Sequence, residues 1–88
     1  MQNDDHDFAH YSHGWWVFYG TFRATGQLAF LFNVKADNKY IAIKKGQSLY
    51  AGLPMDSPVR RLYSTDENTA RPLNREQAEL LESKEMGK

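Results

Sequence analysis

The fold of this 88-residue chain is decided by the stretch WWVFYGTF, residues 15–22. Apart from one glycine, its residues are aromatic or β-branched, and such side chains favour a strand. Because side chains alternate along a strand, the stretch presents two faces. One face holds Trp15, Val17, Tyr19 and Thr21, and the other holds Trp16, Phe18 and Phe22. Both faces are apolar, so we expect either a central strand or a strand with one face against a partner.

The next segment, residues 27–34, alternates in the manner of a half-buried strand. It follows a short turn at residues 24–26, where Gly26 can adopt a positive φ. The apolar positions on its stronger face are predicted to point into the core. They are Leu28, Phe30, Phe32 and Val34.

Three shorter strands are predicted beyond a turn at residues 35–39, which is rich in Asp and Asn. They cover residues 40–44, with Ile41 and Ile43 inward, and residues 47–51 and 59–63. We therefore expect a mainly β (α+β) protein. Its residues 14–64 would form a small antiparallel meander or barrel-like sheet of 4–5 strands.

The two ends differ from this middle segment. Residues 1–13 are polar and acidic and lack either hydrophobic period, so we expect a flexible, disordered tail. Residues 65–73 are polar and are predicted to be a linker. A short C-terminal helix is predicted over residues 74–86, because Asn74 can cap it and Gln77 sits at the capping-box position.

Charge and aromatic residues are concentrated in the middle of the chain. The net charge is zero overall, but residues 14–64 carry +5, residues 1–13 carry −3 and residues 65–88 carry −2. Ten of the twelve aromatic residues also lie within residues 14–64. A basic, aromatic-rich sheet predicts either a surface for a partner or an ordinarily solvated sheet. The candidate partner-binding residues are Trp15, Trp16, Phe18, Tyr19, Tyr40, Lys44, Lys45, Tyr50, Arg60 and Arg61.

Several function classes receive no support from the sequence. The absence of cysteine excludes disulfides, thiolate zinc sites and a cysteine nucleophile. His6, His10 and His13 match no zinc-site spacing, and no glycine-rich phosphate loop precedes a helix. The longest apolar run has five residues, whereas a membrane span needs about 20. We expect a cytoplasmic protein that is not an enzyme, with no metal, no small-molecule cofactor and no membrane contact.

Two functions remain for the aromatic and basic sheet. The first is a small non-catalytic protein-binding regulator, adaptor or inhibitor, of the kind that phages and mobile elements encode. Its partner would be another protein or a second copy of the chain. The alternative is a single-stranded nucleic-acid-binding module built on an OB-like or SH3-like small barrel.

Overall fold

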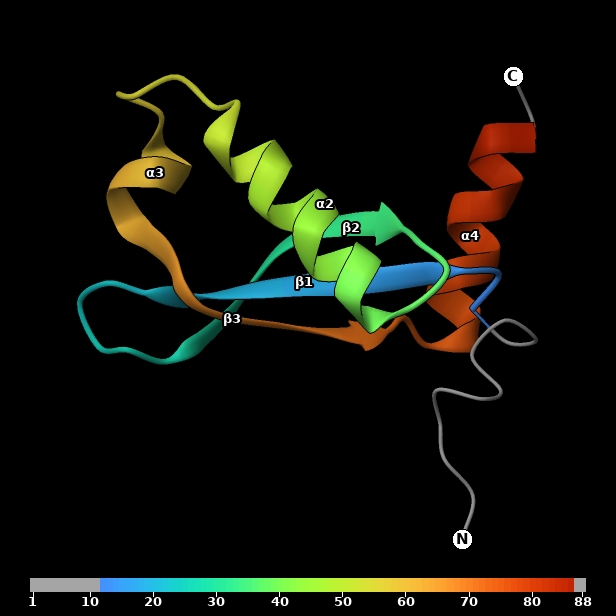
Figure 1. Ribbon diagram of the computed structural model, residues 1–88. Helices are drawn as coiled ribbons and strands as arrows, with labels where there is room; N and C mark the ends of the chain where they lie inside the picture. Colours follow the sequence, from blue (N-terminus) through green and yellow to red (C-terminus); the bar gives the residue numbers. More distant parts are fainter. Residues whose placement is uncertain (1–11, 87–88) are drawn as a thin grey trace, which may run out of the picture.

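The computed structural model describes residues 12–86 of the chain. The chain forms an α+β fold with one open antiparallel sheet, whose strand order is β2-β1-β3 (Figure 1). The elements, in chain order, are β1 Trp15–Phe22, β2 Leu28–Lys35, α2 Lys39–Ala51, α3 Pro58–Leu62, β3 Tyr63–Pro72 and α4 Arg75–Met86. The described residues therefore hold three strands in place of the predicted 4–5, and the sheet is not a barrel.

β1 is the central strand, and helices of the same chain pack against both of its faces, α4 at one end only. Trp16 packs on the side of α2, in a cluster with Val34 and Ala42. Trp15 and Val17 pack on the other side, with Ala78 of α4. In Figure 1, α2 lies in front of the sheet and α4 behind one end of it. The two apolar faces of this strand are therefore used within one copy of the chain.

Residues 39–51 form a helix, so the strands predicted at 40–44 and 47–51 are wrong. Asn38, which lies in the predicted turn at residues 35–39, is the N-cap, and its side chain accepts the Ile41 N–H at 2.9 Å. Ala42 and Gly46 are four residues apart and therefore share a helix face, and both are buried. These small residues let α2 approach the sheet closely, an arrangement that the alternating Ile-Ala-Ile pattern did not reveal.

A bulge in the β1–β2 pairing corrects the predicted core face of β2. Phe18 pairs with Phe32, but Tyr19 pairs with Phe30, so one extra residue of β2 lies between them. One inserted residue reverses the alternation, so that side chains before it and after it lie on opposite faces from those that simple alternation predicts. Phe32 and Val34 pack against the α2 side, as predicted, whereas Leu28 and Phe30 are 50% and 56% exposed.

The segment expected as a linker, residues 65–73, coincides largely with β3. β3 pairs with β1 at the edge of the sheet, and only Ala70 of it is buried. An edge strand exposed to solvent tolerates a polar sequence, so hydrophobic alternation is absent. Residues 58–62, most of the strand predicted at 59–63, form the short helix α3.

The C-terminal helix agrees with its prediction. Asn74 accepts the Gln77 N–H at 2.9 Å, and its carbonyl accepts the Ala78 N–H. Leu73 and Ala78 lie in one buried cluster, as expected for a hydrophobic staple. The predicted flexible tail lies outside the described residues except for Ser12 and His13. Ser12 is buried, and its carbonyl accepts the Trp15 N–H at 2.8 Å.

Candidate functional site

A groove of about 430 Å³ opens where the edge of β2 meets α2. We call it the β2-edge groove. Its lining comes from three elements, β1, β2 and α2, and Trp15 is the residue that the central strand β1 contributes. The lining residues are Trp15, Asn33, Val34, Lys35, Lys45, Ser48 and Leu49.

The floor of the groove is apolar and belongs to the core. Trp15 and Val34 are both buried, on opposite faces of the sheet. Leu49 of α2 forms an apolar wall and is 49% exposed. An exposed leucine beside buried apolar residues provides a surface that a partner side chain can cover.

Lysine side chains border this apolar surface. The Lys45 ammonium donates a hydrogen bond to the backbone carbonyl of Lys35, at the edge of β2. Lys45 also lines two adjoining hollows, one with Lys44 and one with Asp37. The Lys44 ammonium lies 5.7 Å from the centre of the Tyr40 ring. In the part of the chain that the structure describes, neither Lys44 nor Lys45 pairs with a carboxylate.

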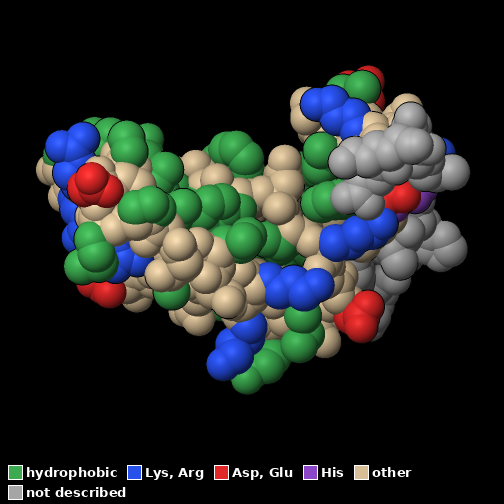
Figure 2. Space-filling model, turned by 90° about the horizontal axis from the view of Figure 1, so that it is seen from above, with side chains coloured by type: hydrophobic (Ala, Val, Ile, Leu, Met, Phe, Trp, Pro, Cys, Tyr) green, Lys and Arg blue, Asp and Glu red, His purple; other side chains and the backbone are tan. Residues whose placement is uncertain are grey.

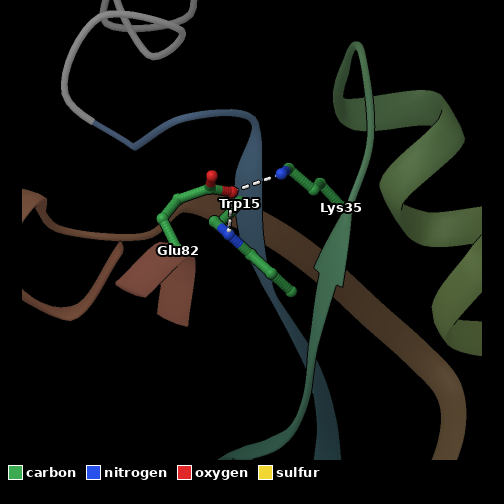
Figure 3. Close-up of polar contacts among 3 residues, drawn as sticks. All are labelled: Trp15, Lys35 and Glu82. Atoms are coloured by element: carbon green, nitrogen blue, oxygen red, sulfur yellow. Dashed lines mark hydrogen bonds and ion pairs between the residues drawn. The ribbon is translucent and has the colours of Figure 1, made fainter. Parts of the chain in front are cut away.

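At one end of the groove, the carboxylate of Glu82 in α4 contacts two of the lining residues, Trp15 and Lys35 (Figure 3). Glu82 accepts a hydrogen bond from the Trp15 indole N–H at 2.9 Å and forms an ion pair with Lys35. The Lys35 ammonium also lies 5.5 Å from the centre of the Trp15 ring. The hydrogen bond from Lys35 is the main cause that lowers the pKa of Glu82, while partial burial opposes it. Glu82 therefore orients two of the groove's lining residues.

The surface view agrees with this arrangement of charge. Figure 2 shows the molecule from above, on the side of β2, with hydrophobic side chains in a band along the middle. Lys and Arg side chains lie toward both ends of the band and below it. A partner on this side would contact apolar surface at its centre and cations at its periphery.

The ten predicted site residues do not form one surface. Tyr40, Lys44 and Lys45 lie on α2, where Lys45 lines the groove, Lys44 lines an adjoining hollow and Tyr40 lies beside Lys44. Trp15 contributes to the floor of the groove, although it is buried. Trp15 and Lys45 are the predicted residues that line the groove itself.

Three predicted residues lie at the other end of α2. The Tyr50 hydroxyl donates to the Tyr63 carbonyl at 2.8 Å and accepts from the Arg23 guanidinium at 3.0 Å. Arg60 stacks over the Tyr50 ring at 5.1 Å and donates to the Tyr50 carbonyl at 3.0 Å. Arg61 is exposed on α3. Tyr50 and Arg60 thus join α2 to α3 and β3.

The remaining three predicted residues are parts of the core. Trp16 and Phe18 are fully buried, and Tyr19 is partly buried against the α4 cluster. The rings of Trp16 and Phe18 therefore offer no exposed face to a partner in this fold, whereas Tyr19 keeps part of its surface exposed. Trp16 and Phe18 are covered by the helix at residues 39–51, which sequence reasoning did not predict.

Of the groove's residues on α2, sequence reasoning predicted Lys45 and missed Ser48 and Leu49. Lys45, Ser48 and Leu49 share a helix face, since they are three and four residues apart. The N-cap residue Asn38 was the signal that could have revealed this spacing. Asn33 and Lys35 could be assigned to the groove only once β2 was known to be an edge strand.

Further observations bear on the type of site. Among residues 12–86, no group of three or more His, Asp or Glu side chains is arranged to hold a metal ion. His6 and His10 lie outside the described residues. None of the helices within 12–86 has the length and apolar character needed to cross a membrane.

No protein-family model matches the chain, and no curated protein or solved structure is similar enough to it to indicate a relative.

Proposed function

We propose that this chain is a small non-catalytic protein-binding module, of the regulator, adaptor or inhibitor type, which holds a segment of a partner protein in the β2-edge groove. The observation that carries this proposal is the groove itself, an apolar floor at an open strand edge with lysines beside it. Interfaces of this kind combine an apolar centre with a polar rim.

The competing function, binding of single-stranded nucleic acid, has less support. It needs exposed aromatic rings on which bases stack, next to cations that contact phosphates. Trp16 and Phe18, two of the rings expected for stacking, are fully buried. Tyr40 on α2, beside Lys44, and Phe30 on β2 are exposed, but among the described residues these two rings form no ring pair on which successive bases could stack.

A selection from a displayed library of random peptides tests the proposal directly. The immobilised full-length protein is the bait, and each enriched peptide is then measured against two variants. Leu49→Asp places a charge in the apolar wall of the groove. Leu80→Asp is the matched control, because Leu80 is also a helical leucine, is 61% exposed and does not line the groove.

We expect enriched peptides to bind the wild type and Leu80→Asp equally, and Leu49→Asp much more weakly. A selection that yields no peptide sensitive to Leu49→Asp would show that the groove does not bind protein segments. A labelled single-stranded oligonucleotide, titrated at low and high salt, tests the alternative. Tight binding that falls steeply with salt would favour nucleic acid instead.

A further inference from the structure

We infer that the partner segment is extended and acidic, and that it adds to the sheet as a strand beside β2 with one of its carboxylates on Lys45. This inference rests on the proposed function and specifies the chemistry of its partner. Three features of the structure support it: the free edge of β2, the hydrogen bond from Lys45 to the Lys35 carbonyl and the spacing of the groove's side chains.

The first step concerns the edge of β2. β2 pairs with β1 on one side only, because it is the outer strand of the sheet. In an antiparallel pair, backbone groups of successive residues point alternately toward the partner strand and away from it. The Ala36 N–H donates to the Gly14 carbonyl at 2.9 Å, so the groups of the preceding residue, Lys35, point outward.

The Lys45 ammonium donates a hydrogen bond to this outward carbonyl of Lys35 and so occupies it. A lysine at a strand edge is a device that protects the edge from indiscriminate pairing. An ammonium binds a carboxylate more strongly than it binds a neutral carbonyl. An incoming carboxylate can therefore draw Lys45 away, and the Lys35 carbonyl can then accept an N–H from the added strand. After this exchange, the ammonium and the carbonyl each have a partner again.

Charge in the groove favours an acidic segment. Lys35 already pairs with Glu82, so Lys45 and Lys44 are the cations that a partner's carboxylate can reach. Asp37 is the acidic residue in the lining of the adjoining hollow, and it does not line the groove. A second copy of the chain is a poorer occupant, because lysines near a two-fold axis would face their own copies.

Spacing defines the segment further. Lys45 and Leu49 are four residues apart on α2, about 6 Å along the helix. Two residues of a strand span about 6.6 Å, and side chains two apart share a face. An acidic residue and an apolar residue separated by one position would thus contact Lys45 and Leu49 together. We expect this acidic-x-apolar pair, in either chain direction, among peptides that bind the groove.

Fluorescence anisotropy with labelled peptides from the selection tests the inference. Each peptide that depends on Leu49 is measured as selected, with its acidic residue replaced by the amide, and with backbone N-methylation at successive positions. The protein variants are Lys45→Gln and Lys39→Gln. Lys39 is the matched control, since it is an exposed lysine of α2 that does not line the groove.

We expect Lys45→Gln and the amide peptide each to weaken binding about tenfold, and the two changes together to weaken it little more. Lys39→Gln should leave affinity unchanged, and N-methylation should abolish binding at alternate positions. Groove-dependent peptides that lack acidic residues, or that bind Lys45→Gln as tightly as wild type, would overturn this inference and leave the proposed function standing. The absence of any groove-dependent peptide would overturn both.

Self-association gives a separate readout in the same preparation. Sedimentation velocity from micromolar to millimolar protein is compared for wild type and Leu49→Asp. We expect both to sediment as monomers. A dimer that Leu49→Asp dissociates would identify a second copy as the occupant and would overturn the acidic segment.

Discussion

Gly46 of α2 lies against the ring of Phe18 of β1 so closely that a Cβ atom at position 46 would be 2.1 Å from the Phe18 Cγ. No heavy-atom contact of that length is tolerated, and Phe18 is fully buried, so its ring has little room to move. A glycine in the middle of a helix usually lowers helix stability. Here it sets how closely the helix packs on the sheet.

We therefore predict that Gly46→Ala destabilises the protein by about 1–3 kcal/mol, the usual cost of overpacking a core. The gain in helix propensity, about 1 kcal/mol, offsets only part of this cost. Urea unfolding monitored by tryptophan fluorescence measures the difference. Gly52→Ala is the control, because the nearest atoms to a Cβ there are 3.6 Å away. Equal stability of Gly46→Ala and wild type would show that α2 does not sit on Phe18 in this way.

The bulge in β2 predicts different roles for two phenylalanines that simple alternation places on one face. Phe32 stacks with Phe18, with ring centres 6.1 Å apart, whereas Phe30 is 56% exposed. We expect Phe32→Ser to cost about 2 kcal/mol or more and Phe30→Ser about 0.5 kcal/mol or less. Thermal unfolding of the two variants compares them. Equal losses would indicate an unbroken strand without the bulge.

Glu82 is expected to make stability depend on pH. Its pKa in the folded protein is lowered, chiefly by Lys35, with smaller contributions from Trp15 and His13. A lowered pKa means that the folded state favours the ionised carboxylate. The resulting stability is complete above the unfolded-state pKa of about 4.3 and is lost as the pH falls through the folded value.

Glu82→Gln should accordingly lower the thermal midpoint at neutral pH and have a smaller effect in acid. The matched control is Glu79→Gln, because the Glu79 side chain is 54% exposed in its pair with Arg75, against 20% for Glu82. Midpoints measured from pH 7 downward by circular dichroism provide the comparison. A constant difference between Glu82→Gln and wild type at every pH would contradict an ionic role for Glu82.

Tyr50 is predicted to act in the fold and not in partner binding. Its hydroxyl donates to the Tyr63 and Arg60 carbonyls and accepts from Arg23, so Tyr50→Phe removes three hydrogen bonds between separate parts of the chain. We expect a loss of about 1 kcal/mol in stability and unchanged affinity for groove-binding peptides. Tyr40→Phe, at an exposed tyrosine of the same helix, should change stability by less than about 0.5 kcal/mol. Weaker peptide binding by a fully folded Tyr50→Phe variant would extend the site to this end of α2.

The sequence by itself determined the central strand and the C-terminal helix. Residues 15–22 carry apolar side chains on both faces, and any fold that buries both must place this strand between two layers. Asn74 and Leu73 supply local capping signals that act within a few residues, so the start of α4 could also be predicted. The hairpin turn is local too, and Gly26 has the expected positive φ of 75°.

Only the tertiary structure decided the conformation of residues 39–51 and the position of the groove. Ile, Tyr and Gly in this segment have weak helix propensity, and their alternation resembles a strand. The helix forms because Ala42 and Gly46 fit against the sheet and Asn38 caps its start, so packing overrides local preference. The bulge, the pairing of the polar β3 and the meeting of Lys45 with Lys35 depend on the same contacts. These contacts join residues that are distant in sequence, and local patterns of hydrophobicity and charge cannot specify them.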